Sequence, residues 1–285
     1  MSTLTASPAT RSRTPQAAPA GRVTFLHLLN SEWIKLVTLR STWWTLGSTV
    51  VVMVLFALMM AAANGFDAGP DGPPPTPGAS VVTFGYIFAQ VSVGVLGALI
   101  VTGEYSTGMI RSTIAAAPGR TGVMLAKASV LAVVTFVTGV VGVLLSYLAT
   151  AGMLGDGVAD LGDGETWRIF LGAGGYLALI ALFAFALGII IRNGAATIAA
   201  ILGVTLLLTI LVSILGFSLE WLGNIAPYLP AAAGAQIMTP TMDAASAAQM
   251  GFTVSPTPWE GFAILAGYVA ITLGIGLTLL KKRDV

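Results

Sequence analysis

The chain has very few of the residues on which most enzymes depend. Its 285 residues include no cysteine and one histidine, and only 9% of them are charged. The absence of cysteine excludes disulfides, thiolate metal sites and a cysteine nucleophile. Soluble domains carry roughly 25% charged residues. The scarcity of charge, combined with 56% hydrophobic residues, therefore predicts an integral membrane protein with a single membrane domain.

Six long apolar stretches make up most of the chain. A helix needs about 20 predominantly apolar residues to cross the hydrocarbon core of a bilayer. The stretches that meet this length are residues 43–63, 81–102, 128–150, 170–191, 195–217 and 259–280. None of them shows the alternating pattern of a barrel strand. The expected fold class is therefore an all-α membrane protein with six transmembrane helices.

The basic residues indicate how these spans are oriented. With the N-terminus in the cytoplasm, twelve of the thirteen lysine and arginine residues fall on the cytoplasmic side, and only Arg168 falls outside. Cytoplasmic loops of membrane proteins carry this excess of positive charge. Nine of the twelve acidic residues fall on the opposite side. We therefore expect both termini in the cytoplasm.

Two segments precede the first span. Residues 1–22 are rich in serine, threonine, alanine and proline, which predicts a disordered cytoplasmic tail. Residues 23–42 predict an amphipathic helix along the inner membrane surface. Its two sides carry apolar side chains (Phe25, Leu26, Leu29, Trp33, Leu36, Val37) and polar ones (His27, Ser31, Lys35, Thr38). A plain extension of the first span is disfavoured, because Glu32, Lys35 and Arg40 would then be buried.

The outer connections differ from one another. Residues 64–80 are rich in proline and glycine, which predicts a flexible segment. Residues 152–165 are acidic, but their spacing does not match a calcium-binding EF-hand loop, so a solvated loop is expected. Residues 218–258 form a longer outer segment that is apolar yet broken by Pro227 and Pro230. Short helices dipping back at the outer face and an ordinary surface loop both fit this pattern.

The residues inside the spans argue against a membrane enzyme. His27 lies on the polar side of the amphipathic helix, and the six stretches contain no charged residue except Glu260 at the outer end of the last one. Catalytic sites and proton relays in membranes generally need such groups. Most hydroxyl side chains in the spans are expected to join helices to one another. The candidates for lining a translocation path are Gln90, Ser92, Thr135, Thr138, Thr205 and Thr209.

Any uphill transport must draw its energy from another polypeptide. The chain has no GxxxxGK[ST] phosphate-binding loop. An ATPase would therefore have to dock on the cytoplasmic face, where the largest connection is GEYSTGMIRSTIAAAPGR, residues 103–120.

The 103–120 segment predicts an amphipathic helix. Glu104 would stand at its N-terminal end, where the helix dipole favours an anion, and Pro118-Gly119 would end it. The polar side, with Glu104, Thr107, Gly108 and Arg111, would face the cytosol. Alternatively, the segment is a connector whose arginines only enforce topology.

Four features together resemble the permease subunits of type-2 ABC transporters. These features are SEWIKLVTLRSTWW at residues 31–44, the 103–120 segment followed by Lys127, YLPAAAGAQIM at 228–238 and the ending LLKKRDV. The resemblance implies a six-helix domain, residues 23–285, that pairs with a second copy or a paralogue above two ATP-binding subunits. It implies that residues 103–121 hold a coupling helix. The residues implied to contact the ATPase are Glu104, Tyr105, Gly108, Met109 and Arg111.

The resemblance also implies where the protein acts and what it needs. We expect the permease subunit of an ATP-driven exporter, which is not itself an enzyme, in a bacterial inner membrane. ATP and magnesium would bind to the partner subunit, and this chain would need no cofactor or metal. Its partners would be the ATP-binding subunits, a second permease and the lipid bilayer, without nucleic acid. Two alternatives stay open: a membrane scaffold or immunity-type protein that docks a partner without transport, and an ion-coupled carrier.

Overall fold

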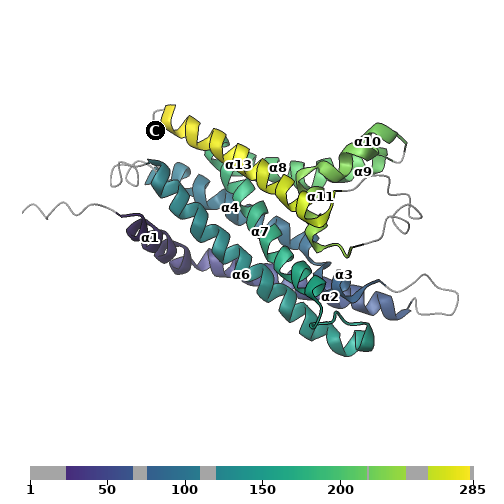
Figure 1. Ribbon diagram of the computed structural model, residues 1–285. Helices are drawn as coiled ribbons and strands as arrows, with labels where there is room; N and C mark the ends of the chain where they lie inside the picture. Colours follow the sequence, from purple (N-terminus) through teal and green to yellow (C-terminus); the bar gives the residue numbers. More distant parts are fainter. Residues whose placement is uncertain (1–23, 67–75, 110–119, 217, 242–255, 283–285) are drawn as a thin grey trace, which may run out of the picture.

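The computed structural model describes residues 24–66, 76–109, 120–216, 218–241 and 256–282 (Figure 1). Within these ranges every regular element is a helix and no strand occurs. Six segments are long and apolar enough to cross a membrane: Arg40–Asn64, Gly78–Ser106, Thr121–Leu154, Gly164–Ile191, Gly194–Gly216 and Pro258–Lys282. The prediction of an all-α fold with six spans is confirmed. The predicted tail, residues 1–22, lies outside the described residues.

Four of the spans are continuous helices and two are composite. The continuous ones are α2 (Arg40–Phe66), α6 (Arg120–Leu154), α7 (Gly164–Ile191) and α13 (Pro258–Lys282). The second span joins the short α3 (Gly78–Thr83) to α4 (Tyr86–Ser106). The fifth consists of α8 (Gly194–Leu202), the π-helical η2 (Gly203–Leu207) and α9 (Leu208–Gly216). Helices satisfy the backbone internally, as the hydrocarbon core requires.

Helix α7 lies at the centre of the bundle. It contacts α4, α6, α8 and α13 (Figure 1). Its large side chains Phe170, Tyr176, Ile180 and Phe185 are fully buried. The first span, α2, packs on α4 and α6, and the spans around α7 keep many apolar side chains on their outer surfaces.

Small residues allow α7 to approach its neighbours closely. A Cβ atom on Gly97 of α4 would lie 2.1 Å from the carbonyl oxygen of Ala181 on α7. On the side facing α6, a Cβ atom on Gly139 would lie 2.8 Å from the Cα atom of Gly174. Membrane helices depend on such close backbone contacts, because lipid offers no hydrophobic drive for helices to associate. These two crossings therefore require glycine.

The outer segment after the fifth span folds into short helices. They are α10 (Glu220–Ile225), η3 (Ala226–Tyr228), α11 (Pro230–Ala235) and η4 (Gln236–Met238). Helix α11 packs on α13, where a Cβ atom on Gly261 would lie 2.3 Å from the carbonyl oxygen of Ala233. The described part of this segment therefore forms short helices, of which α11 and η4 are covered by protein, whereas α10 and η3 have no buried residues.

The one basic residue predicted on the outer side holds this outer segment in place. Arg168 Nη1 donates to the carbonyl oxygen of Ile237 at 2.7 Å, and Nη2 donates to that of Thr239 at 2.9 Å. Arg168 also pairs with Glu165 at 2.8 Å, and Glu165 accepts hydrogen bonds from Thr241. Arg168 therefore joins the start of α7 to the end of the outer helices.

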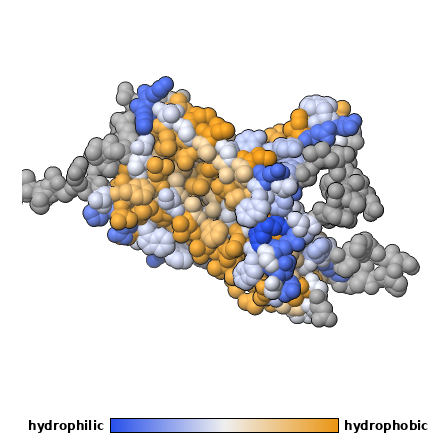
Figure 2. Space-filling view, viewed as in Figure 1, coloured by the Kyte–Doolittle hydropathy of each residue, from blue (hydrophilic) through white to orange (hydrophobic). Residues whose placement is uncertain are grey.

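Helix α1 (Phe25–Thr38) precedes the bundle and is separated from α2 by Leu39. It packs against α6 and leaves Leu26, Trp33 and Ile34 exposed. The C-terminal ends of α4 and α13 and the start of α6 lie at the same end of the molecule as α1 (Figure 1). The face shown in Figure 2 is largely hydrophobic between ends where hydrophilic residues gather.

Candidate functional site

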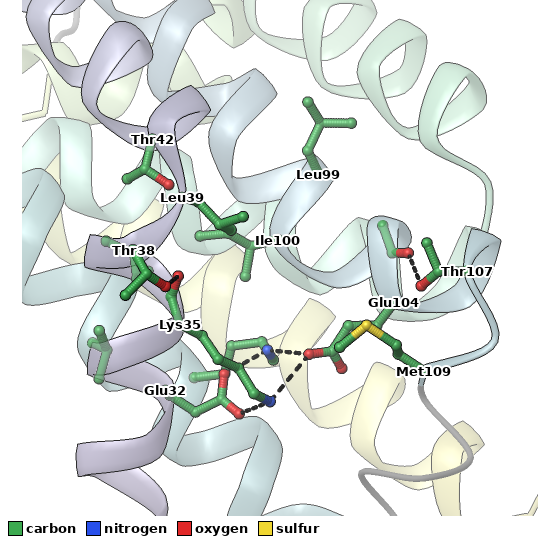
Figure 3. Close-up of a pocket in the computed structure, with 14 residues that line it drawn as sticks. Glu32, Lys35, Thr38, Leu39, Thr42, Leu99, Ile100, Glu104, Thr107 and Met109 are labelled. Atoms are coloured by element: carbon green, nitrogen blue, oxygen red, sulfur yellow. Dashed lines mark hydrogen bonds and ion pairs between the residues drawn. The ribbon is translucent and has the colours of Figure 1, made fainter.

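Three elements converge at the α1 end of the bundle, directly before the 103–120 segment leaves α4. Helix α1 contributes Glu32, the last turn of α4 contributes Glu104, and the start of α6 contributes Lys127. All three residues are buried. We call these residues and Lys35 of α1 the ion cluster (Figure 3).

Lys127 lies between the two carboxylates of the ion cluster. Its Nζ donates to Glu32 Oε2 at 2.6 Å and to Glu104 Oε1 at 2.7 Å. Lys35 Nζ lies 2.8 Å from Glu32 Oε1 and 3.5 Å from Glu104 Oε1. Two positive and two negative charges thus neutralise one another within one network. Its contacts link positions 32 and 104 to position 127, so α1, α4 and α6 are tied together by charge.

Burial of the Glu104 carboxylate would be energetically unfavourable without its ion-pair partners. Glu104 lies in the last turn of α4, where the helix dipole disfavours an anion. Its Oε2 is buried and has no hydrogen-bond partner within the described residues. A buried charge is tolerated only when it is paired. The contact with Lys127 at 2.7 Å supplies this pairing.

Lys35 lies at the edge of the ion cluster. Its side chain is 39% exposed, compared with 4% for Glu32 and 9% for Glu104. Partial burial lowers the pKa of Lys35, but the carboxylates of Glu32 and Glu104 outweigh this effect and raise it above 10.5. The ammonium group is therefore charged under all physiological conditions.

One sequence prediction is wrong at this end of the bundle. Glu104 does not begin a separate helix or face the cytosol; α4 continues through it to Ser106 and buries it. Residues 23–42 do contain a separate helix, α1, as expected, although Glu32 is only 4% exposed within it. In both cases Lys127 supplies the compensating charge that the sequence pattern did not reveal.

The remaining predicted coupling residues follow Glu104. Tyr105 is half-buried on α4, and Thr107 caps that helix. Gly108 has a φ of 73°, a left-handed conformation that suits glycine and turns the chain away from α4. Met109 is 48% exposed. Arg111 and the predicted helix end at Pro118-Gly119 lie outside the described residues.

A second connection at this end touches the same part of α4. Arg192, between α7 and α8, has a φ of 60°, which is uncommon for a residue other than glycine. Its guanidinium group lies 5.2 Å from the centre of the Tyr105 ring. The adjacent Asn193 caps α8 by accepting a hydrogen bond from the backbone of Ala196 at 3.0 Å. The short α7–α8 turn thus contacts the end of α4.

A cavity of about 300 Å³ adjoins the ion cluster (Figure 3). Its walls come from α1, the start of α2, the end of α4 and the start of α6. The ion cluster lies on one wall, and most of the remaining lining is apolar. The apolar lining residues are Leu36, Leu39, Leu99, Ile100, Met109 and Val130.

The six candidate path residues do not form one group. Gln90 is buried in the core, where it accepts a hydrogen bond from the Tyr176 hydroxyl at 2.5 Å. Ser92 is half-buried on α4. The hydroxyls of Thr135, Thr138 and Thr205 donate to carbonyl oxygens one turn earlier in their own helices. Their role in a translocation path stays a prediction.

Thr209 differs from the other candidate path residues. Its Oγ1 is buried without a hydrogen-bond partner in the described part of the chain. It follows the π-helical turn η2, in which Thr205 lies. Such turns are frequent at functional sites.

No constellation for metal binding occurs among the described residues, where groups of three histidine, cysteine or acidic side chains are absent. The ion cluster has the chemistry of a structural contact that holds helices together. Its residues pair with one another and present no nucleophile beside a general base.

Comparison with known proteins assigns the chain to a family. The family described as ABC-2 family transporter protein matches residues 28–212, well over half of the 285 residues. The match includes most of α1, the ion cluster, the 103–120 segment, the first four spans and most of the fifth. Among curated proteins no significant match is found. Six apolar helices and this match together make the chain a multi-pass membrane protein that serves as a permease component of an ABC transporter. The chain belongs to the ABC-2 family of transporter proteins.

Proposed function

We propose that the chain is the permease subunit of an ATP-driven exporter and that its 103–120 segment docks a separate ATP-binding subunit. The observation that carries this proposal is the ion cluster at the base of the segment. Glu104 lies two residues before the end of α4 at Ser106, and Lys127 lies seven residues after α6 begins at Arg120. Both ends of the segment are thereby fixed to each other and to α1.

This arrangement supports transmission of movement from the segment into the spans. Lys127 binds Glu104 and Glu32 at 2.7 Å and 2.6 Å, so α4, α6 and α1 move as a unit if the segment is displaced. Tyr105 and Arg192 extend the connection to α7 and α8. ATP-driven closure of the partner ATPase could then tilt the spans between inward-open and outward-open arrangements.

The proposed orientation puts the ion cluster on the cytoplasmic side of a bacterial inner membrane. The excess of lysine and arginine supports this orientation, with both termini in the cytoplasm. Two ATP-binding subunits, which carry ATP and magnesium, would lie beneath this chain and a second permease copy or paralogue. The path would lie between the two permeases and is proposed to involve Gln90, Ser92, Thr135, Thr138, Thr205 and Thr209.

The docking role can be tested at Arg111. In the reconstituted complex, Arg111→Ala is expected to lower ATPase stimulation and transport about tenfold or more, because a residue central to an interface is worth 2 kcal/mol or more. The amount of chain inserted in the membrane should stay unchanged. Arg111 is preferable to Glu104 for this test, since replacing Glu104 would also disturb the ion cluster.

Arg40→Ala provides the matched control, because Arg40 is an exposed basic residue at the start of α2. It should insert normally and retain ATPase stimulation. Full coupling in Arg111→Ala would contradict the docking role. Transport that persists without any ATP-binding subunit would instead indicate an ion-coupled carrier, and partner docking without transport would indicate a scaffold.

A further inference from the structure

We propose that the cavity beside the ion cluster is a binding site for an anionic phospholipid. Its phosphate would contact Lys35, and the upper part of an acyl chain would lie between α1 and α4. The shape and lining of the cavity carry this inference, together with its position beside an interfacial helix. The inference does not depend on an ATPase partner.

The walls of the cavity suit a hydrocarbon chain. Its apolar lining includes Leu36, Ile100, Val130, Leu39 and Leu99. Leu39 is 54% exposed and Leu99 is 49% exposed. A free inorganic anion would leave these apolar surfaces uncovered. An amphiphile covers them and removes apolar area from water.

The charge distribution favours an anionic head group. The carboxylates of Glu32 and Glu104 are almost fully buried, whereas the ammonium of Lys35 is partly exposed. The positive end of the otherwise neutral ion cluster thus faces outward. Lys35 Nζ can donate three hydrogen bonds. Figure 3 shows its contacts with Glu32 and Glu104, and these leave one hydrogen for a phosphate oxygen.

The location of the cavity matches the depth of lipid head groups. Helix α1 exposes Leu26 and Ile34, as expected for a helix in the plane of the membrane interface. The cavity lies between α1 and the ends of the spans α4 and α6. A lysine at this depth typically contributes about 1 kcal/mol to the attraction of anionic lipid, which corresponds to about fivefold in affinity. A membrane phospholipid is therefore favoured over a soluble anion as the ligand of the cavity.

Gly103 offers a direct way to fill the cavity. It lines the cavity on α4, and a Cβ atom at this position would meet no atom within 4 Å. Gly103→Leu should therefore occupy the site without displacing the ion cluster. Replacing a helical glycine also favours the helix. Loss of bound lipid in this variant would not reflect loss of the fold.

The experiment uses the purified full-length chain in nanodiscs that contain phosphatidylcholine and a photoactivatable phosphatidylglycerol. Labelled peptides and retained lipids are read by mass spectrometry. We expect labelling of peptides that contain Leu39 and Leu99, with about fivefold preference for phosphatidylglycerol. Lys35→Gln should abolish the preference while retaining lipid. Gly103→Leu should lower labelling of both peptides about tenfold.

Gly267→Leu is the matched control, because Gly267 on α13 also has open space at its Cβ position and lies away from the cavity. It should label like the natural chain. The proposal is overturned if Gly103→Leu labels normally or if Lys35→Gln keeps the full preference. It is equally overturned if inorganic phosphate displaces the lipid, or if Leu39→Cys forms a cross-link between two copies while no lipid labels the site.

Discussion

Replacing Lys127 with methionine is expected to destabilise the folded chain by about 3 to 5 kcal/mol, the usual effect of removing one partner from a buried ion pair. The Lys127 side chain is only 6% exposed and binds Glu32 and Glu104 at once. Its loss leaves two buried carboxylates with only the half-exposed Lys35 nearby. Thermal unfolding in nanodiscs, followed by the fluorescence of the six tryptophans, measures the effect.

Two further variants show whether burial of charge is the cause. Lys35→Met removes a partly exposed ammonium from the same ion cluster and should cost about 1 kcal/mol or less. The triple variant Glu32→Gln, Glu104→Gln, Lys127→Met removes all three buried charges and should regain most of the stability lost in Lys127→Met. Equal losses in Lys127→Met and Lys35→Met would contradict the buried ion cluster.

The second large effect is expected at Gly97, where α4 and α7 are closest. In Gly97→Leu the new Cβ atom would lie 2.1 Å from the carbonyl oxygen of Ala181, so the two backbones must separate. Overpacking of a core usually costs about 1 to 3 kcal/mol. We expect a cost at the upper end of this range or above it, because the obstacle is backbone and cannot change rotamer.

The yield of monodisperse protein and its unfolding temperature report this effect. Gly267→Leu introduces the same side chain on α13 at a site with open space and should behave like the natural chain. If Gly97→Leu were as stable as Gly267→Leu, the close crossing of α4 and α7 would be wrong.

The number and approximate position of the spans could be predicted because hydropathy over about 20 residues is a local property. The central position of α7 could not be predicted in this way. Every span is apolar, and lipid and protein interior both accept apolar side chains. Position 97 requires glycine because Ala181 lies opposite to it in the folded chain, and the hydropathy pattern does not show this contact.

The ion cluster depends on contacts between distant parts of the sequence. Glu32 and Lys127 are 95 positions apart, and Glu104 and Lys127 are 23 apart. The sequence nevertheless contained one indication of the ion cluster. The predicted topology leaves only three acidic residues on the basic side, namely Glu32, Glu104 and Asp284. Two of these three pair with Lys127, so an acid on the positively charged side was an indication of a specific partner.

The predicted start of a new helix at Glu104 is wrong for a related reason. The prediction placed it there because the apolar stretch ends near Thr102. The preceding helix α4 continues for one more turn to Ser106, since Lys127 allows a carboxylate to be buried there. A boundary in hydropathy therefore did not coincide with the end of the helix.

In the proposed function, the end of the bundle carrying the ion cluster faces the cytoplasm and binds an ATP-binding subunit. The chain has no natural cysteine, so single cysteines can be introduced at two exposed positions, Thr107→Cys beside the ion cluster and Leu161→Cys at the opposite end. Cross-linking in cells that co-express the ATP-binding subunit tests both parts of this proposal. We predict a cross-link to that subunit from position 107 and none from position 161, with a membrane-impermeant thiol reagent reaching only position 161 in intact cells. A cross-link from position 161, or external labelling of position 107, would contradict the account.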